Sequence, residues 1–524
     1  MINKLLLNSI IFSGLTVAGF GQAPSIQWEI SYGGTASEFT NSIIELPGKG
    51  FAIVGATLSV DGDIVGNHGG YGDVWYLETD SLGTIVRSKC FGGSGDEGAY
   101  SIDKVGNNGF YLGGFTTSCD GDVSSCIGGA DYWLLRVDSN LNILWEKTYG
   151  GTDADELRSI KTTPDGGCVL FGYTLSVDGD VTGAHTCNGC SSDMWILKVD
   201  SLGNVEWNRA LGSTGNEWGY DITLSPDGGY VMAGNAELVN GDVTYSNGLS
   251  DYWVIKLNSS GQLVWQHCLG GSDQDLANSI LATPDGGYIV SGSTQSSDGD
   301  VSINHGYEDN WIVKLDSLGN IIWENSIGGS NADRGYIVRE SSHGSYLVLS
   351  ETLSSDGQVI GFHGYTDIWL SKIDSIGNLL WQRALGGSFF DEPTGLLVLN
   401  NNDCIVLGYS NSTDGDVSGN HGGTNCTQSE SCLDGWAVKL STITNEETIS
   451  NSVKMFVYPN PAKEYFSIKN LRLPRRIFLY SFSGIKIKQF ELKSTEEKLD
   501  ISYLSPGVYF LKTEDGAVSK LLKY

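Results

Sequence analysis

Basic residues are scarce in this chain of 524 residues, which has 31 Lys and Arg against 62 Asp and Glu. The net charge of −31 argues against nucleic acid and against anionic membrane surfaces as partners. Methionine is also scarce, with 4 residues, and only 18% of the chain is charged, whereas glycine is abundant, with 71 residues. This composition is typical of a turn-rich β protein and not of a helical one.

Common catalytic signatures and long apolar runs are missing as well. The sequence contains no GxSxG, HExxH, P-loop or CxxCH motif. Beyond residue 21, no segment approaches the roughly 18 apolar residues that a membrane helix needs. The mature protein is therefore expected to contain no transmembrane span.

The N-terminal segment has the pattern of a secretory signal peptide. Lys4 precedes an apolar run from Leu5 to Phe20, and Gly19 and Gly21 stand at the −3 and −1 positions of a cleavage site. This predicts a signal peptide over residues 1–21, with an uncleaved N-terminal anchor as the alternative. Export would place the protein where disulfides form.

The ten cysteines fall into two sorts. Four lie singly in strand patterns and are predicted to be buried free thiols: Cys90, Cys168, Cys268 and Cys404. Three close pairs lie in Gly/Ser-rich connectors and are predicted to be disulfide staples: Cys119 with Cys126, Cys187 with Cys190, and Cys426 with Cys432. The CxxC at Cys187 is also a redox or zinc half-site pattern, but no second CxxC accompanies it.

A tryptophan-bearing stretch recurs seven times between residues 26 and 441. Its clearest copy, Asp309 to Gly329, alternates apolar and polar residues on both sides of a Gly/Asn turn, which predicts a β-hairpin. A Trp held at a fixed place in every unit indicates packing and not chemistry. The first Trp of the hairpin recurs at Trp75, Trp133, Trp195, Trp253, Trp311, Trp369 and Trp436, and the second at Trp28, Trp145, Trp207, Trp265, Trp323 and Trp381.

Each unit contains four strand-like segments, with a period near 58 residues. Seven such units predict an all-β fold, a seven-bladed β-propeller of four-stranded blades, over residues 22–441. The chain enters with a lone fourth strand, Ser25 to Gly33, and leaves with a third strand, Asp434 to Leu440. Pairing these two strands would complete the seventh blade. An open solenoid, the alternative, needs capping units that the sequence does not show.

The hairpin turn resembles a known propeller signature. Leu315 to Asn320, followed by Trp323 and Gly328, is similar to the tryptophan-docking repeat of quinoprotein dehydrogenase propellers. The resemblance implies that this Trp wedges between adjacent blades, and it is not extended to quinone chemistry. Arg87 replaces the Trp in one unit, which predicts a looser junction there.

The C-terminal segment is a different module. Residues 442–451 form a polar linker, and residues 452–524 contain short strands that predict a small antiparallel β-sandwich. This tail resembles the C-terminal sorting domain of the type IX secretion system of Bacteroidota, which implies the type IX machinery as a partner and release or surface attachment after export. The resemblance is carried by Tyr458 to Ala462, Ser483 to Lys486, Leu499 to Phe510 and Lys520 to Lys523.

Acidic connectors supply the candidate site. A connector that resembles DGDVxGxHGG follows the second strand of each unit, although one copy begins with Asn240 and another has Gln358 in place of the second Asp. A GGSxxDE connector follows the fourth strand. Both connectors are predicted to emerge on one face of the ring, because the chain reverses at each strand. Closely spaced Asp oxygens suit calcium, whereas an ordinary turn and a transition-metal site with His are the alternatives. The candidate calcium ligands are Asp61, Asp63, Asp120, Asp122, Asp178, Asp180, Asp298, Asp300, Asp414 and Asp416, and the histidines of this face are His68, His185, His305, His363 and His421.

The sequence therefore predicts an exported propeller, without catalytic residues, that binds a glycan or protein ligand through its acidic loop face. A hydrolase or lyase acting on an extracellular polysaccharide is the alternative, and carboxylates from two blades in one deep pocket would favour it. A purely structural surface protein is the third interpretation.

Overall fold

The computed structural model describes residues 23–48, 50–106, 108–185, 191–421, 432–441, 456–458, 462–469, 475–481, 486–492, 497–513 and 518–524. The chain divides into two compact units, Met1–Thr442 and Ile443–Tyr524. The predicted signal peptide (residues 1–21) and linker (residues 442–451) lie outside the described residues, as do Cys187, Cys190 and Cys426. No helix among the described residues is both long enough and apolar enough to cross a membrane.

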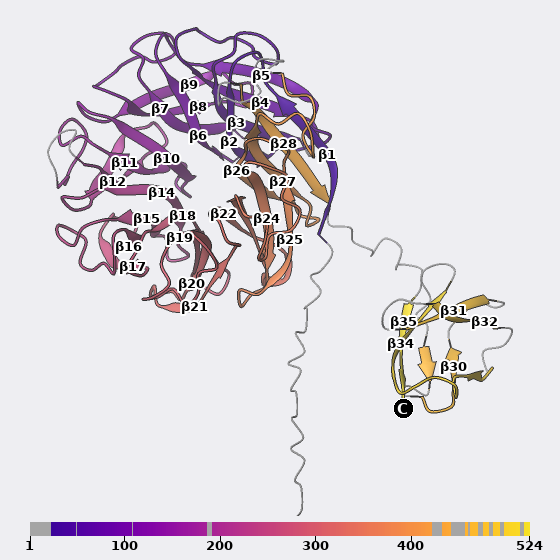
Figure 1. Cartoon of the computed structure of the whole chain (residues 1–524). Coiled ribbons are helices and arrows are strands. Elements are labelled where there is room, and N and C mark those ends of the chain that lie inside the picture. Colours follow the sequence, from indigo (N-terminus) through magenta and orange to yellow (C-terminus); the bar gives the residue numbers. More distant parts are fainter. Residues whose placement is uncertain are drawn as a thin grey trace, which may run out of the picture. The chain divides into compact units, whose positions relative to one another are not determined.

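The first unit contains seven four-stranded antiparallel sheets that follow one another around a ring (Figure 1). It is a seven-bladed β-propeller, which confirms the predicted fold class. Blade 1 comprises β2 (Glu38–Glu45), β3 (Phe51–Thr57), β4 (Asp73–Thr79) and β5 (Ile85–Phe91). Blade 2 comprises β6 (Glu97–Lys104), β7 (Phe110–Thr116), β8 (Asp131–Val137) and β9 (Ile143–Tyr149), and blade 3 comprises β10 (Asp155–Thr162), β11 (Cys168–Thr174), β12 (Asp193–Val199) and β13 (Val205–Leu211).

The remaining blades repeat this order from the innermost to the outermost strand. Blade 4 comprises β14 (Glu217–Leu224), β15 (Tyr230–Ala236), β16 (Asp251–Leu257) and β17 (Leu263–Leu269). Blade 5 comprises β18 (Asp275–Ala282), β19 (Tyr288–Thr294), β20 (Asp309–Leu315) and β21 (Ile321–Ile327). Blade 6 comprises β22 (Asp333–Glu340), β23 (Tyr346–Thr352), β24 (Asp367–Ile373) and β25 (Leu379–Leu385), with the short 3₁₀ helix η1 (Ser342–Gly344) after β22.

Blade 7 joins the two ends of the ring. It comprises β26 (Asp391–Val398), β27 (Cys404–Ser410), β28 (Asp434–Ser441) and, as its outermost strand, β1 (Ser25–Tyr32). β1 pairs with β28 in antiparallel register, with Ser31 opposite Trp436. The Trp436 indole N–H also donates to Glu29 Oε2 over 3.1 Å. The predicted closure is confirmed, and the ring has no unpaired sheet edge at this joint.

The first Trp of each hairpin is a packing residue, as predicted. Trp311 has no exposed surface, and its ring lies 4.7 Å from that of Tyr252 in the preceding blade. Its indole N–H donates to Glu324 Oε2 over 2.8 Å, so burial leaves no donor unpaired. The set Trp75, Trp133, Trp195, Trp253, Trp311, Trp369 and Trp436 is at most 1% exposed.

The second Trp docks on the next blade. The Trp323 indole N–H donates to the carbonyl of Ser375 over 3.1 Å. Its ring covers Gly377, which has a φ of +87° and where a Cβ would lie 2.9 Å from the ring, so this turn needs glycine. Trp28, Trp145 and Trp265 make the equivalent bonds to Ser81, Ser201 and Ser317.

Arg87 preserves this contact at the junction where the Trp is missing. Its Nη2 donates to the carbonyl of Ser139 over 3.1 Å, at the position that the indole N–H reaches in other blades. Leu141 replaces the turn glycine and keeps a positive φ of 65°. The exchange of Trp for Arg and of Gly for Leu therefore leaves the interblade hydrogen bond in place.

The cysteines of the described residues follow the prediction. Cys119 and Cys126 form a disulfide with a Cα–Cα distance of 5.1 Å, and Cys432 is disulfide-bonded. The four strand cysteines, Cys90, Cys168, Cys268 and Cys404, are free and buried.

The described residues of the second unit form two small antiparallel sheets. Its core includes Phe466, Ile477, Leu479, Leu511 and Leu521. One sheet has the order β29 (Phe456–Tyr458), β30 (Tyr465–Lys469), β33 (Leu499–Asp500), and the other β32 (Lys486–Leu492), β31 (Arg475–Ser481), β34 (Gly507–Thr513), β35 (Val518–Lys523).

Deleting residues 23–32 tests the closure of the ring. We expect a large fall in the thermal unfolding midpoint, because β28 becomes an exposed edge and blade 7 loses a quarter of its strands. The matched control restores the strand after Ser441 through a DSLGN turn, as in the other hairpins, and is expected to recover the midpoint. An unchanged midpoint after the deletion would contradict closure by β1.

Candidate functional site

The two acidic connectors lie together on one face of the propeller, as predicted. In blade 1, the Thr35 backbone N–H donates to Oδ1 of Asp61 over 2.8 Å. We call this surface the connector face and the opposite one, with the DSLGN turns, the turn face. The same bond recurs in every blade, from Thr35, Ser94, Thr152, Thr214, Ser272, Ser330 and Ser388 to Asp61, Asp120, Asp178, Asn240, Asp298, Asp356 and Asp414.

The second Asp of four DGD connectors also accepts a backbone hydrogen bond. The Oδ2 atoms of Asp63, Asp122, Asp180 and Asp300 accept from the N–H groups of Gly33, Gly92, Gly150 and Gly270 over 3.1 to 3.4 Å. In the fifth connector, Asp416 instead lies 3.8 Å from Nη2 of Arg383. Within the described ranges, no three His, Cys, Asp or Glu side chains form a group that would hold a metal ion. These bonds are those of a structural turn, and calcium binding stays a prediction.

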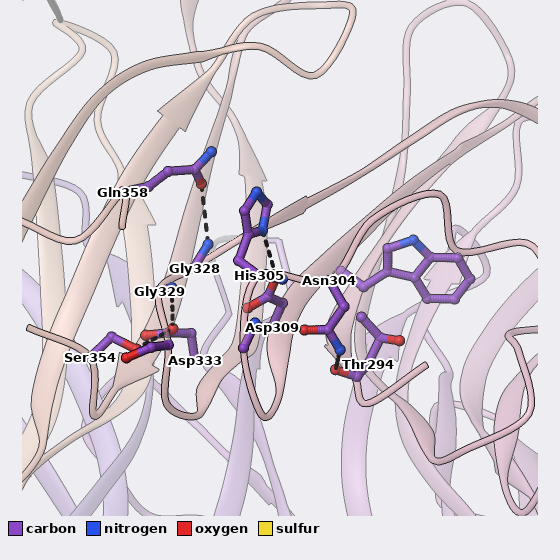
Figure 2. A network of polar contacts seen from close by, with 12 residues as sticks. Thr294, Asn304, His305, Asp309, Gly328, Gly329, Asp333, Ser354 and Gln358 are labelled. Atoms are coloured by element: carbon purple, nitrogen blue, oxygen red, sulfur yellow. Dashed lines mark hydrogen bonds and ion pairs between the residues drawn. The ribbon is translucent and has the colours of Figure 1, made fainter. Parts of the chain in front are cut away.

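The connector histidines contact a carboxylate that the sequence analysis did not single out. His305 Nδ1 lies 2.7 Å from Oδ2 of Asp309, the first residue of β20 (Figure 2). His68, His185, His363 and His421 make the same contact with Asp73, Asp193, Asp367 and Asp434. An Asp stands two residues before every first Trp of the hairpins, and this fixed spacing was the available signal.

Each of these aspartates faces a second buried carboxylate across a blade junction. A Cβ on Gly328 would lie 2.5 Å from Oδ1 of Asp309 and 2.8 Å from Oδ2 of Asp333, so both carboxylates converge beside this glycine (Figure 2). Asp309 and its equivalents begin the third strand of each blade, and among the described residues no hydrogen-bond partner reaches their Oδ1 atoms. The seven pairs are Asp73 with Glu97, Asp131 with Asp155, Asp193 with Glu217, Asp251 with Asp275, Asp309 with Asp333, Asp367 with Asp391, and Asp434 with Glu38, and each residue is at most 1% exposed.

Burial raises the pKa of at least one carboxyl group in each pair. It raises the pKa of Asp333 to about 6, and the charge of Asp309 adds to the effect. Burial likewise raises the pKa of Asp155 and Asp275 to about 6, and that of Glu217 and Asp391 to about 7. Two close carboxylates in a dry site do not both ionise readily, so one proton shared between them would also satisfy the unpaired oxygen.

The central channel is lined by the innermost strands of all seven blades and has a volume of about 620 Å³. A β-bulge in each of these strands directs one side chain into it. These residues are Asn41, Tyr100, Arg158, Tyr220, Asn278, Tyr336 and Thr394.

Carboxylates from three blades also line the channel: Asp103, Asp221 and Glu392. Asp221 accepts hydrogen bonds from the hydroxyls of Ser159, over 2.9 Å, and Ser279, over 3.1 Å. The Tyr409 hydroxyl donates to Glu392. Asp221 thus bonds to the innermost strands of both adjacent blades, and Glu392 bonds to the next strand of its own blade.

A smaller cavity of about 490 Å³ lies between blades 1 and 2. We call it the Gly98 pocket, because the other blades carry a side chain at the place of Gly98. It shares Asn41, Tyr100 and Tyr409 with the channel. Its lining comprises Phe39, Asn41, Ala56, Leu58, Tyr71, Asp96, Glu97, Gly98, Tyr100, Phe115 and Tyr409. In the sequence, this pocket is marked only by one glycine among many.

Residues 456–523 match the family model described as "Secretion system C-terminal sorting domain". The tail is thus a type IX sorting domain, as its motifs predicted. The chain is a β-propeller protein delivered by type IX secretion across the outer membrane, to the cell surface or the extracellular space. The sorting domain also makes the type IX machinery a partner of this tail.

Other similarities are distant. The regulatory protein FlaEY of Caulobacter vibrioides is 28% identical over 165 residues, which cover 29% of this chain and 17% of that protein. PorZ of Porphyromonas gingivalis, a surface component of the type IX secretion system, is 10% identical at a TM-score of 0.39 and covers 90% of this chain and 58% of its own. The Pan2 WD40 domain of Neurospora crassa is 9% identical at a TM-score of 0.42, covering 79% and 96%.

The carboxyl pairs predict a pH-dependent stability. A folded-state pKa raised to 6 or 7 stabilises the fold below the unfolded value near 4, and this contribution is lost as the pH rises through 6 to 7. We therefore expect the thermal unfolding midpoint to fall by several degrees between pH 5 and pH 8. A midpoint that stays constant or rises over this range would contradict the shared-proton interpretation.

Asp131→Asn provides the matched test of one pair. The amide oxygen keeps the bond from the Ile127 N–H, which is 2.9 Å long in the native protein, and the new NH₂ group donates toward Asp155. We expect the variant to be more stable than the native protein at pH 8, with little difference at pH 5. A loss of stability at pH 8 would contradict the proposal that Asp131 and Asp155 share a proton.

Excess chelator tests the calcium hypothesis. Because backbone donors already bind most of the DGD carboxylates, we expect the unfolding midpoint to stay unchanged and the purified protein to contain no stoichiometric calcium. A lower midpoint in chelator, restored by calcium, would establish the calcium interpretation, since a metal that binds only the folded state stabilises it.

Proposed function

We propose that this protein is a non-catalytic binding propeller, delivered outside the cell, that holds a glycan or protein ligand on its connector face. The observation that carries the proposal is the Gly98 pocket, which combines aromatic walls with carboxylates beside the central channel. Concave sites with apolar walls and a few polar groups are typical of ligand binding.

Exposed tyrosines extend this surface around the ring. Tyr71, Tyr307 and Tyr365 precede the third strands of blades 1, 5 and 6 and are 80%, 67% and 63% exposed. A second cavity of about 490 Å³ lies between Tyr307 and Tyr365 and includes Arg334 and Phe362. Exposed aromatic rings supply rigid contact area with a polar tip, which suits both sugar rings and protein side chains.

The hydrolase or lyase alternative has one observation in its favour, since Asp103, Asp221 and Glu392 line the same channel. Their hydrogen bonds to neighbouring strands favour a structural role for at least Asp221 and Glu392. Release of reducing ends from a retained polysaccharide, lost in Asp221→Asn, would instead support the enzyme.

A glycan array tests the proposal with two triple variants of the full chain, in the presence and absence of calcium. Replacing Tyr71, Tyr307 and Tyr365 by Ala is expected to reduce glycan retention at least tenfold, because all three rings lie on the connector face. The control replaces Leu202, Leu318 and Ile376, which are 65%, 65% and 66% exposed on the turn face, and is expected to bind as the native protein does.

Retention that is lost in the turn-face variant and kept in the tyrosine variant would contradict the proposal. If no glycan is retained, the same two variants are compared in photo-cross-linking of surface proteins on the producing cells. Cross-links that do not depend on the three tyrosines would then exclude the protein ligand as well.

A further inference from the structure

The Gly98 pocket exists because one side chain is absent from a repeated position. The residues that match Gly98 in the other blades are Phe39, Glu156, Trp218, Leu276, Arg334 and Glu392. A Cβ on Gly98 would lie 3.0 Å from the ring of Phe115, so a larger side chain here would enter the cavity. Blade 2 therefore lacks the side chain that every other blade carries at this position.

Five aromatic residues line the pocket. Phe39 and Tyr409 meet edge to face with ring centres 5.3 Å apart, and Tyr100 and Phe115 lie 6.0 Å apart. Tyr71, which is 80% exposed, stands where the pocket opens. The lining contains no Lys or Arg, so the wall itself supplies no cation.

Asp96 gives this aromatic site its charge. Among the residues that the structure describes, none donates a hydrogen bond to the Asp96 carboxylate, although its backbone is bonded to Thr117. Burial raises the pKa of Asp96, and the charges of Glu97 and Glu156 raise it further. Asp96 and Glu97 both line the pocket, where a bound cation would relieve their repulsion.

The junction between blades 2 and 3 shows a cation bound between aromatic rings and a carboxylate. Arg158 occupies in blade 3 the place that Tyr100 occupies in blade 2, and its guanidinium lies 4.3 Å from the ring centre of Tyr100 and 5.5 Å from that of Tyr173. Its Nη2 pairs with Glu156 Oε2 over 2.7 Å. There the chain fills the space between two aromatic rings and a carboxylate with a cation of its own.

We propose that the Gly98 pocket binds an alkylated ammonium group of the ligand, held between the aromatic rings and neutralised by Asp96. This inference rests on the proposed function and specifies the chemistry of the group that is recognised. Aromatic faces attract cations through their quadrupole, and a methylated ammonium gives up water more readily than a bare one. The net charge of −31 would concentrate such cations near the protein.

Calorimetric titration of the full chain at pH 8 tests the inference with choline and its uncharged isostere, 3,3-dimethyl-1-butanol. The two probes have nearly the same shape, so a difference between them reports the charge. We expect choline to bind at one site, at least tenfold more tightly than the alcohol. Equal affinities, or no binding of choline, would overturn the inference.

Two variants locate the site, and each introduces a residue type that another blade carries at the same position. Asp96→Asn introduces an amide like Asn216 and Gln274 at the matching positions of blades 4 and 5, and Gly98→Leu introduces the residue of Leu276. Each is expected to weaken choline binding at least tenfold. Asp273→Asn removes an equal charge from an exposed residue elsewhere on the connector face and is expected to have no effect. Binding that survives both pocket variants would place choline elsewhere and refute the site.

The source of the ammonium group is distinguished by two further probes. A peptide with trimethyl-lysine and a phosphocholine-substituted carrier present the same cation on a protein and on a glycan-type ligand, and the tighter of the two identifies the source. The experiments distinguish an error in the ammonium inference from an error in the proposed function. If glycans are retained through the three tyrosines while Asp96→Asn and Gly98→Leu change nothing, the connector face binds its ligand without an ammonium group.

Discussion

Ring closure is the constraint on which the rest of this structure depends. Each blade buries the Trp of its third strand against a neighbouring blade, as Trp311 does against Tyr252. This packing is complete only when every blade has a neighbour on both sides. The pairing of β1 with β28 provides the last neighbour. The Gly98 pocket depends on it directly, because Phe39, Gly98 and Tyr409 belong to the first, second and last blades.

The same junctions hold the buried carboxyl pairs, so the packing of the ring is coupled to protonation. Asp309 and Asp333 converge on Gly328 because the connector that carries this glycine passes from one blade to the next without a side chain to separate them. Because a carboxyl pair recurs at all seven junctions, its modest effect on stability is repeated seven times. A protein displayed outside the cell meets the pH of its surroundings, and the raised pKa values of the pairs predict a propeller that is more stable at mildly acidic pH than at pH 8.

The repeat itself made most of the fold predictable. The fixed spacing of Trp75 and its equivalents sets the blade number, and the split hairpin at the two ends of the repeat sets the closure. The sorting domain was predictable from contiguous motifs such as Tyr458 to Ala462. In each case the information is local in the sequence or periodic along it.

The candidate site was predictable only in outline. The acidic connector face followed from strand direction, but the pairing of Asp309 with Asp333 requires knowing how a connector crosses a junction. The Gly98 pocket depends on a missing side chain, and its walls come from segments as distant as Phe39 and Tyr409. A sequence pattern does not show where side chains from distant segments leave a cavity between them.

The most direct test of this account is the location of a chain that ends at residue 451 in cells that secrete the full protein. The propeller closes on itself without the sorting domain, and delivery depends on that domain. The account predicts that the truncated chain accumulates in the periplasm, protease-resistant and with the unfolding midpoint of the intact propeller. A truncated chain that reaches the cell surface or the medium, or that is degraded as an unfolded protein, would contradict it.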